Sequence, residues 1–312
     1  MSRDDVKPAP AQAATAAAAG GAAAEATPAT PSRWARSDLA RVLRSGQVRA
    51  GLIMTIIMVI FAIVGPFLAP RNPNDASGGP GPYNPPTDGF PLGTDNIGND
   101  VLSRLLAGGI HLAWMAPASA FTAVLLGAVV GVVAAYYGGV VDMLLMRLMD
   151  VLLAFPLVVF IILFVSMVGP KPWLLVVLVV IGMVPGVARV LRGAALPLKE
   201  REYVLWATAA GIPARRIMLR EYLPNIWSPL MVELGMRLMW SIGALASISY
   251  LGYGIQAPDF DWGTMIEESR NGLQTQPWAV LVPVLVIVLF TIGSNIMAEG
   301  AARVVARTEK DR

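Results

Sequence analysis

A polar stretch interrupts the apolar part of the chain and decides its fold: REYVLWATAAGIPARR, residues 201–216. It continues to Leu223-Pro224-Asn225, and long apolar segments lie on both sides of it. A chain that only needs to turn back into a bilayer can do so with a short connection. We therefore expect a folded element here, on one side of a membrane, that receives force from another protein.

The composition is that of an integral membrane protein. Of the 312 residues, 55% are hydrophobic and 14% are charged, and soluble domains carry about a quarter charged residues. The chain has no cysteine and one histidine, His111, which excludes disulfides, thiol nucleophiles and multi-histidine metal sites. We find no nucleophile beside a base, so the sequence gives no indication of an enzyme.

Six segments contain the roughly 20 mainly apolar residues that a spanning helix needs. They are residues 51–69, about 111–136, about 143–168, 173 to about 190, about 226–250 and about 278–298. A tight turn at residues 137–139 separates the second from the third. The expected fold class is an all-α membrane protein with six transmembrane helices.

Lysine and arginine collect on the cytoplasmic side of membrane proteins, which predicts the orientation. Five arginines at residues 33–49 directly precede the first segment, so we expect both the N- and the C-terminus in the cytoplasm. The expected regions are a disordered Ala/Pro-rich tail at 1–31, a basic cytoplasmic segment at 32–49, the six-helix domain at 50–305 and a cytoplasmic tail at 306–312. Within the domain we expect a cytoplasmic loop at 199–225 and external loops at 70–108 and 251–277.

The cytoplasmic loop has the signals of two short helices. Glu202 suits the positive end of a first helix, Gly211 suits its end, and Pro213 suits the first position of a second helix. Ala207 and Gly211 are four residues apart and would share a face almost without side chains, which fits a partner's groove. The residues alone leave a second interpretation open, a helix that only covers the bundle.

This loop resembles the "EAA" coupling loop of permease subunits of bacterial ABC importers. That family has Glu-Ala-Ala, three residues, Gly, and then a Leu-Pro about nine residues later. Gly211 and Leu223-Pro224 match, whereas the Glu-Ala-Ala positions fall on Leu205-Trp206-Ala207, of which only Ala207 matches. Within the family, most of residues 45–305 resemble the dipeptide/oligopeptide (DppC/OppC-type) branch.

Several motifs carry the wider resemblance. They are Pro91-Leu92-Gly93-Thr94-Asp95, Gly98-Asn99-Asp100-Val101-Leu102-Ser103-Arg104, Gly138-Gly139 with Asp142, Met146-Arg147 with Asp150, Ala154-Phe155-Pro156, Arg201-Glu202-Tyr203-Val204, Tyr250-Leu251-Gly252-Tyr253-Gly254 and Trp262-Gly263. Each motif alone is a modest signal of the branch. Their occurrence in this order on one topology is specific.

The resemblance implies a type I ABC importer permease in the bacterial cytoplasmic membrane. It implies a heterodimer with a related permease, two ATPase domains that bind ATP and Mg, an extracytoplasmic solute-binding protein and surrounding lipid, with no nucleic acid. The chain itself would bind no cofactor and would translocate dipeptides or oligopeptides. Related assemblies carry nickel chelates or haem, and these stay as alternatives.

The resemblance also implies which residues contact the ATPase: Glu202, Leu205, Ala207, Gly211, Pro213, Leu223 and Pro224. Leu205 stands where the family has its coupling glutamate. Glu202 lies one helical turn earlier, and we hypothesise that it replaces that contact. Because Leu205 and Trp206 replace Glu and Ala, we expect shape and apolar contact to contribute more than one salt bridge.

Two further sets of residues are candidates for function. Glu233 and Arg237 lie within the fifth segment, four residues apart, where they can form an ion pair; they either line a translocation path or, the interpretation we favour, are structural. The external loops combine a short amphipathic helix, capped by Thr94 or Asp95, with an acidic stretch. As a docking face for the binding protein we expect Asp95, Asp100, Arg104, Asp259 and Asp261; a solvated loop is the alternative.

A self-contained secondary transporter is the alternative of a different class. The chain lacks the Gly-x-x-x-x-Gly-Lys-Ser/Thr loop, so it does not hydrolyse ATP in that manner. A secondary transporter more often has two inverted halves, and we find no such repeat. The coupling loop has no obvious use in such a protein. We therefore favour a permease driven by a separate ATPase.

Overall fold

The computed structural model describes residues 45–77 and 79–310, with side chains described up to residue 304. The expectations for residues 1–31, for most of 32–49 and for 311–312 lie outside this part, whereas the backbone of 306–310 is described and belongs to the last helix. Five helices in it are long and apolar enough to span a membrane. They are α2 (Gly46–Leu68), α4 (Ile110–Tyr137), α7 (Pro172–Ala195), α11 (Trp227–Tyr250) and α13 (Trp278–Lys310).

The third predicted span is not one continuous helix. It consists of α5 (Gly139–Leu153) and α6 (Leu157–Val168), which meet at an angle of 76°. The break falls at Pro156, which lacks an N–H for the helical ladder and keeps Phe155 out of the helical conformation. Counting this bent pair as one span gives the six that the sequence predicts.

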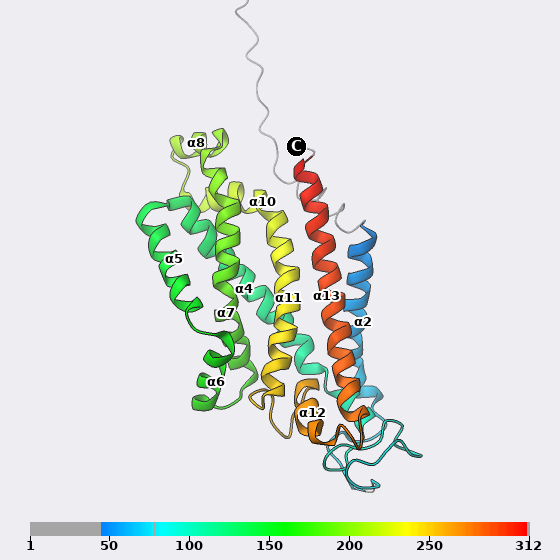
Figure 1. The fold of residues 1–312 in the computed structure, drawn as a ribbon. Helices are drawn as coiled ribbons and strands as arrows, with labels where there is room; N and C mark the ends of the chain where they lie inside the picture. Colours follow the sequence, from blue (N-terminus) through cyan, green and yellow to red (C-terminus); the bar gives the residue numbers. More distant parts are fainter. Residues whose placement is uncertain (1–44, 78, 311–312) are drawn as a thin grey trace, which may run out of the picture. The chain divides into compact units, whose positions relative to one another are not determined.

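The shorter elements lie at the ends of the long helices. α3 (Val101–Ala107), α12 (Trp262–Ser269) and the 3-10 turn η3 (Arg270–Gly272) lie at one end; η1 (Leu196–Glu200), α8 (Glu202–Ala209), α9 (Ala214–Ile217), the π turn η2 (Met218–Tyr222) and α10 (Leu223–Asn225) lie at the other. Figure 1 shows α8 and α12 at opposite ends of α7 and α11. The loops predicted to be cytoplasmic and external are therefore separated by the length of the helices.

Helices α4 and α7 pack closely because glycines remove side chains from their contact. A Cβ on Gly131 would lie 2.6 Å from the carbonyl oxygen of Ala188, and a Cβ on Gly127 would meet the side chain of Val187. Such close packing is typical of small residues four apart on a membrane helix. Val124, Ala128, Val187 and Leu191 form a buried cluster around this contact, and a larger apolar core includes Met115, Leu175, Leu178, Ile242 and Phe290.

Candidate functional site

We define residues 199–225 as the coupling segment. It lies at the end of the long helices where Figure 1 labels α8. Helix α8 begins after Arg201, whose backbone is extended, and has Glu202 in its first turn. The helix ends at Ala209 with Ala210 as its C-cap, and the next residue, Gly211, has a φ of 72°, which is the left-handed conformation. There the Gly211 N–H donates to the Thr208 carbonyl and the Ile212 N–H to the Ala207 carbonyl, both at 3.1 Å. This pair of bonds is a Schellman cap and confirms Gly211 as the stop signal.

The second helix differs slightly from its prediction. Pro213 is the N-cap of α9, with extended ψ of 138°, and not the first helical residue. The helix continues through η2, where the Leu223 N–H donates to the carbonyl of Met218. Pro224 follows directly and has no N–H to donate. The Leu-Pro pair therefore lies where the segment changes its hydrogen-bonding pattern before α11.

One face of the coupling segment is buried against the ends of α4 and α7. Val204, Ala207, Ile217 and Tyr222 are each at most 5% exposed, and they pack in one cluster with Val132. This corrects the expected outward face of Ala207 and Gly211, because only Gly211 is exposed. A small residue at position 207 lets α8 approach the bundle.

The opposite face of α8 presents apolar side chains to solvent. Trp206 is 71% exposed and Leu205 is 57% exposed, and Leu219 on η2 is 52% exposed. Glu202 is exposed as well, and the structure gives it no ion-pair partner among the described residues. An exposed tryptophan beside an exposed leucine is typical of a protein-binding surface.

Glu233 and Arg237 form the ion pair that their spacing predicts. The Arg237 Nε donates to Glu233 Oε2 at 2.9 Å, and Arg237 Nη2 lies 2.8 Å from the same oxygen. The Glu233 side chain is 5% exposed and that of Arg237 is 17% exposed. Gly186 of α7 makes room, since a Cβ there would lie 3.3 Å from Arg237 Nη2. The pair thus lies between α11 and α7, and its place in a path stays a prediction.

Two further ion pairs join α5 to α7, and the sequence interpretation missed both. Asp142 accepts two hydrogen bonds from Arg192, each 2.5 Å long, and Asp150 accepts one of 2.5 Å from Arg189. Both aspartates belong to motifs that carry the family resemblance, and this was the feature of the sequence that could have pointed to them. Their partners lie about 40 to 50 residues away on another helix, so only the fold reveals the pairs.

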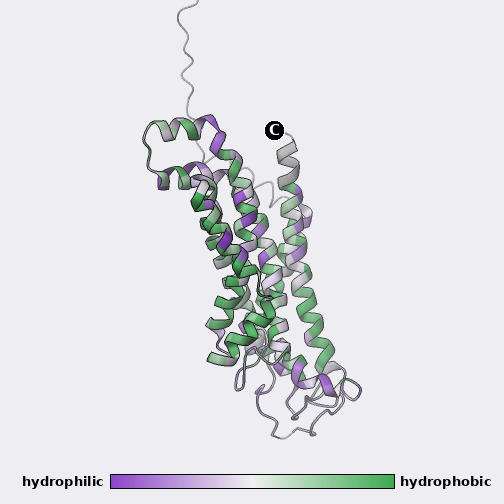
Figure 2. Cartoon of the chain, turned by 60° about the vertical axis from the view of Figure 1, so that its left-hand side comes forward, coloured by the Kyte–Doolittle hydropathy of each residue, from purple (hydrophilic) through white to green (hydrophobic). Residues whose placement is uncertain are grey.

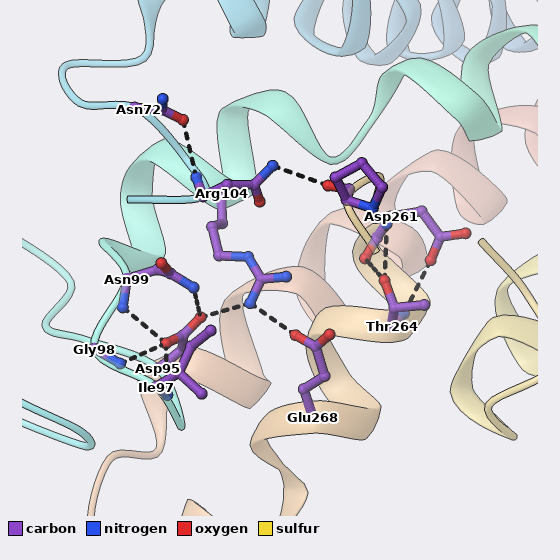
Figure 3. Close-up of polar contacts among 11 residues, drawn as sticks. Asn72, Asp95, Ile97, Gly98, Asn99, Arg104, Asp261, Thr264 and Glu268 are labelled. Atoms are coloured by element: carbon purple, nitrogen blue, oxygen red, sulfur yellow. Dashed lines mark hydrogen bonds and ion pairs between the residues drawn. The ribbon is translucent and has the colours of Figure 1, made fainter. Parts of the chain in front are cut away.

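At the other end of the helices, Arg104 connects the two loops that are predicted to be external, 70–108 and 251–277 (Figure 3). Its Nη1 lies 2.5 Å from Asp95 and 2.7 Å from Glu268 on α12, and its guanidinium lies 4.6 Å from the ring centre of Phe260. Asp95 also accepts backbone hydrogen bonds at the 97–99 turn, one of them from Ile97 at 3.0 Å. Arg104 is 4% exposed, so this cation is buried and paired with two carboxylates through Nη1, while its Nε has no hydrogen-bond partner among the described residues.

Two other aspartates act as helix caps. Asp100 accepts a 3.0 Å bond from the Ser103 N–H and caps α3, in place of the predicted Thr94 or Asp95. Asp261 caps α12 through the Thr264 N–H at 2.9 Å and also accepts from Ser249 on α11 at 2.6 Å. Burial raises the pKa of Asp261, and these hydrogen bonds oppose that shift.

Burial corrects the expected docking face. Asp95, Asp100, Arg104 and Asp261 are each at most 5% exposed, because they hold the external loops together. Only Asp259 is exposed, with 68% of its side chain accessible and its carboxylate 3.9 Å from His111. Docking of a binding protein stays a prediction, and other exposed polar side chains of these loops, such as Asp75, Asp88 and Arg270, are available for it.

Comparison with known families gives the context of this geometry. Residues 123–308 match the family described as "Binding-protein-dependent transport system inner membrane component". The chain belongs to this family. Residues 34–86 match the N-terminal transmembrane domain of oligopeptide transport permease C. The permease therefore has the type I fold that the resemblance implies, is a multi-pass inner-membrane protein, and is a transport subunit separate from the ATPase.

Curated relatives agree with the family assignment. The dipeptide transport permease DppC of Haemophilus influenzae is 33% identical over 80% of this chain and 86% of its own length. The oligopeptide permease OppC of the same organism is 31% identical over 83% and 84%. The glutathione transport permease GsiD of Shigella dysenteriae is 31% identical over 83% and 86%. The family match at residues 123–308 includes the coupling segment and the pairs Asp142–Arg192, Asp150–Arg189 and Glu233–Arg237.

Proposed function

We propose that this permease imports short peptides, driven by ATP hydrolysis on separate subunits. The observation that carries this proposal is the family match together with the exposed Leu205–Trp206 face, which offers a separate protein a place to act. The names of the relatives, dipeptide, oligopeptide and glutathione permeases, support peptides over nickel chelates or haem. A family of binding-protein-dependent systems does not favour an ATP-independent transporter.

The proposed assembly contains a related permease, two ATPase domains and an extracytoplasmic binding protein. ATP and Mg bind to the ATPases, and this chain binds no cofactor. In this proposal the coupling segment is cytoplasmic, as the positive-inside rule predicts, and α12 with the 70–108 loop is external. Glu202, Leu205, Gly211 and Pro213 belong to the ATPase contact, and Ala207, Leu223 and Pro224 support it from within.

The packing of Tyr222 explains how force would pass into the membrane domain. Its ring lies 5.8 Å from the ring of Tyr136 on α4, at 72°, and it is fully buried. Ile226, one turn later, is 1% exposed and directly precedes α11. Because closely packed side chains transmit displacement, a movement of α8 and α9 shifts the ends of α4 and α11 together.

Reconstitution tests the proposal. The permease is co-expressed with the ATPase, permease and binding-protein genes that neighbour its own, purified as a complex and placed in liposomes. We expect ATP hydrolysis to rise when the binding protein carries a dipeptide or tripeptide, and the peptide to be transported. Stimulation by a nickel chelate or haem alone would contradict the substrate. Transport by this chain alone without ATP would overturn the whole proposal.

A further inference from the structure

Helices α5, α7 and α11 carry a strip of charged side chains, which lipid hydrocarbon would not solvate. Its members are Asp142, Arg147 and Asp150 on α5, Arg189 and Arg192 on α7, and Glu233 and Arg237 on α11. All lie in segments long and apolar enough to cross a membrane. Figure 2 shows hydrophilic stretches on the helices in the half nearer α8, whereas the other half is mainly hydrophobic.

The position of the strip on α7 is defined by helical spacing. Gly186, Arg189, Val190 and Gly193 are three, four or seven residues apart and share one side of the helix. Gly186 lies against Arg237, Arg189 bonds Asp150, and a Cβ on Gly193 would meet nothing within 4 Å. The open side of α7 therefore lies between α5 and α11, and it carries the charges of both neighbours.

Exposure shows that this side does not suit lipid. The side chains of Asp150 and Arg189 are 47% and 49% exposed although they are paired, and Arg147 is exposed. Ionisable groups within membrane segments face a protein interior or water, because hydrocarbon does not solvate them. Leu144 and Leu148 of α5 are also exposed beside its charges, whereas the outer side of α2 and α13 exposes apolar side chains such as Ile57, Leu285 and Ile292 in the middle of the helices. That surface suits lipid.

The strip also has an excess of positive charge. Its four arginines stand against three carboxylates, and each carboxylate is bonded to one arginine. Among the described residues no partner is found for Arg147, which is exposed on α5. A fixed cation without a partner attracts an anionic group in water of limited volume.

We propose that the α5–α7–α11 strip is the water-facing wall of the translocation path, and that Arg147 attracts the carboxylate of the passing peptide. This proposal rests on the proposed function for the identity of the substrate. It extends the path from the Glu233–Arg237 pair to α5 and α7. The test distinguishes this water-facing wall from two other arrangements. In one, a second permease packs over the strip; in the other, the strip faces lipid.

The chain contains no cysteine, which makes it a ready background for cysteine accessibility. Val190→Cys places a thiol on the strip, and Ile292→Cys places one on the outer side of α13; the two native side chains are 46% and 43% exposed. Each variant is reconstituted in the complete transporter, with partner cysteines replaced. It is then treated with anionic or cationic membrane-impermeant methanethiosulfonates, and modification of this chain is followed by mass spectrometry.

We expect Val190→Cys to react at least tenfold faster than Ile292→Cys with both reagents. Each labelling rate is first divided by the rate of the same reagent with a free thiol in solution. The ratio of the anionic to the cationic rate at Val190→Cys should then be roughly two- to fivefold lower in Arg147→Gln, as the loss of one nearby charge predicts. Arg270→Gln, which removes an external arginine, should leave the ratio unchanged. Arg147→Gln breaks no bond given by the structure, so folding is preserved.

Equal, slow labelling of the two cysteines would overturn the water-facing wall, and a ratio insensitive to Arg147→Gln would overturn the role of Arg147. Labelling needs no peptide, so it separates this inference from the proposed function. A transporter that labels as expected but imports no peptide would contradict only the substrate.

Discussion

The carboxylate of Asp261 accepts a 2.6 Å hydrogen bond from the hydroxyl of Ser249, so the residue that caps α12 also fastens the end of α11. Asp261 is 5% exposed, and burial raises its pKa. Helices α11 and α12 are therefore joined by one carboxyl group whose charge is disfavoured by its surroundings.

The raised pKa of Asp261 predicts a pH dependence of stability. In the interval above the ordinary aspartate pKa of about 3.9, the folded protein keeps a proton that the unfolded chain has lost. This contribution to the free energy of unfolding is present at lower pH and is lost as pH rises through the folded pKa. Asp261→Asn stays neutral, so its melting temperature should fall less than that of the wild type as pH rises from about 4 to 7. Asp88→Asn, at an exposed position, should keep the wild-type profile.

The backbone of Gly211 predicts a local effect on the coupling segment. Gly211→Ala forces a Cβ into a φ of 72° and should cost about 1 kcal/mol. Hydrogen exchange of residues 202–217 should then be about fivefold faster, because local opening costs less free energy. Gly243→Ala is the control, since a Cβ there meets nothing within 4 Å in a regular helix. Equal exchange in the two variants would show that the Schellman cap is dispensable.

The exposed face of α8 predicts apolar recognition of the ATPase. Trp206→Ala should weaken binding of the purified ATPase subunit to the permease by about tenfold or more, as expected when a central aromatic contact is lost. The melting temperature of the Trp206→Ala permease should hardly change, because Trp206 is 71% exposed. Glu202→Ala should weaken binding by less than about threefold, the effect of an exposed ion pair. A larger loss in Glu202→Ala than in Trp206→Ala would restore the electrostatic hypothesis for Glu202.

The buried pair in α11 predicts a strong loss and a recovery. Glu233→Gln leaves Arg237 without its partner and should lower the free energy of unfolding by about 3 kcal/mol. The double variant Glu233→Gln/Arg237→Gln should recover most of that loss, because neither charge is then buried alone. Both are measured by thermal unfolding in detergent.

A second Glu–Arg pair with the same spacing of four provides the control. Glu299 and Arg303 lie 3.2 Å apart with side chains 51% and 63% exposed, so Glu299→Gln should cost under about 1 kcal/mol. If the double variant at 233 and 237 stays as unstable as the single one, the pair has a further role in packing. Normal transport by the double variant would contradict the placement of the Glu233–Arg237 pair in the translocation path.

Much of the fold follows from local features that the sequence displays. Long apolar segments predicted α2, α4, α7 and α11 within about five residues of their ends, because hydrophobic length is a property of one segment. They also predicted the start of α13 at Trp278, but this helix continues to Lys310, well beyond the predicted end at about 298. Gly211 likewise predicted a helix end, since only glycine takes that conformation without strain. The break at Pro156 was also visible in principle, but the apolar run across it concealed it.

The candidate site was less predictable because burial depends on distant neighbours. Ala207 has the spacing of an outward small face, yet the ends of α4 and α7 cover it. Asp95 and Arg104 have the composition of an exposed polar surface, yet Arg104 pairs with both Asp95 and Glu268 in the interior of the loops predicted to be external. No pattern within either segment distinguishes a satisfied buried charge from an exposed one.

The sequence by itself determined the membrane class, the number of spans, the two-helix coupling segment and the family, because these depend on segment length, order and local backbone chemistry. Only the tertiary structure decided which polar side chains face outward. The pairs Asp142–Arg192 and Asp150–Arg189 show the reason. An ion pair between helices exists only once the packing of α5 on α7 brings together residues that lie about 40 to 50 positions apart in the chain.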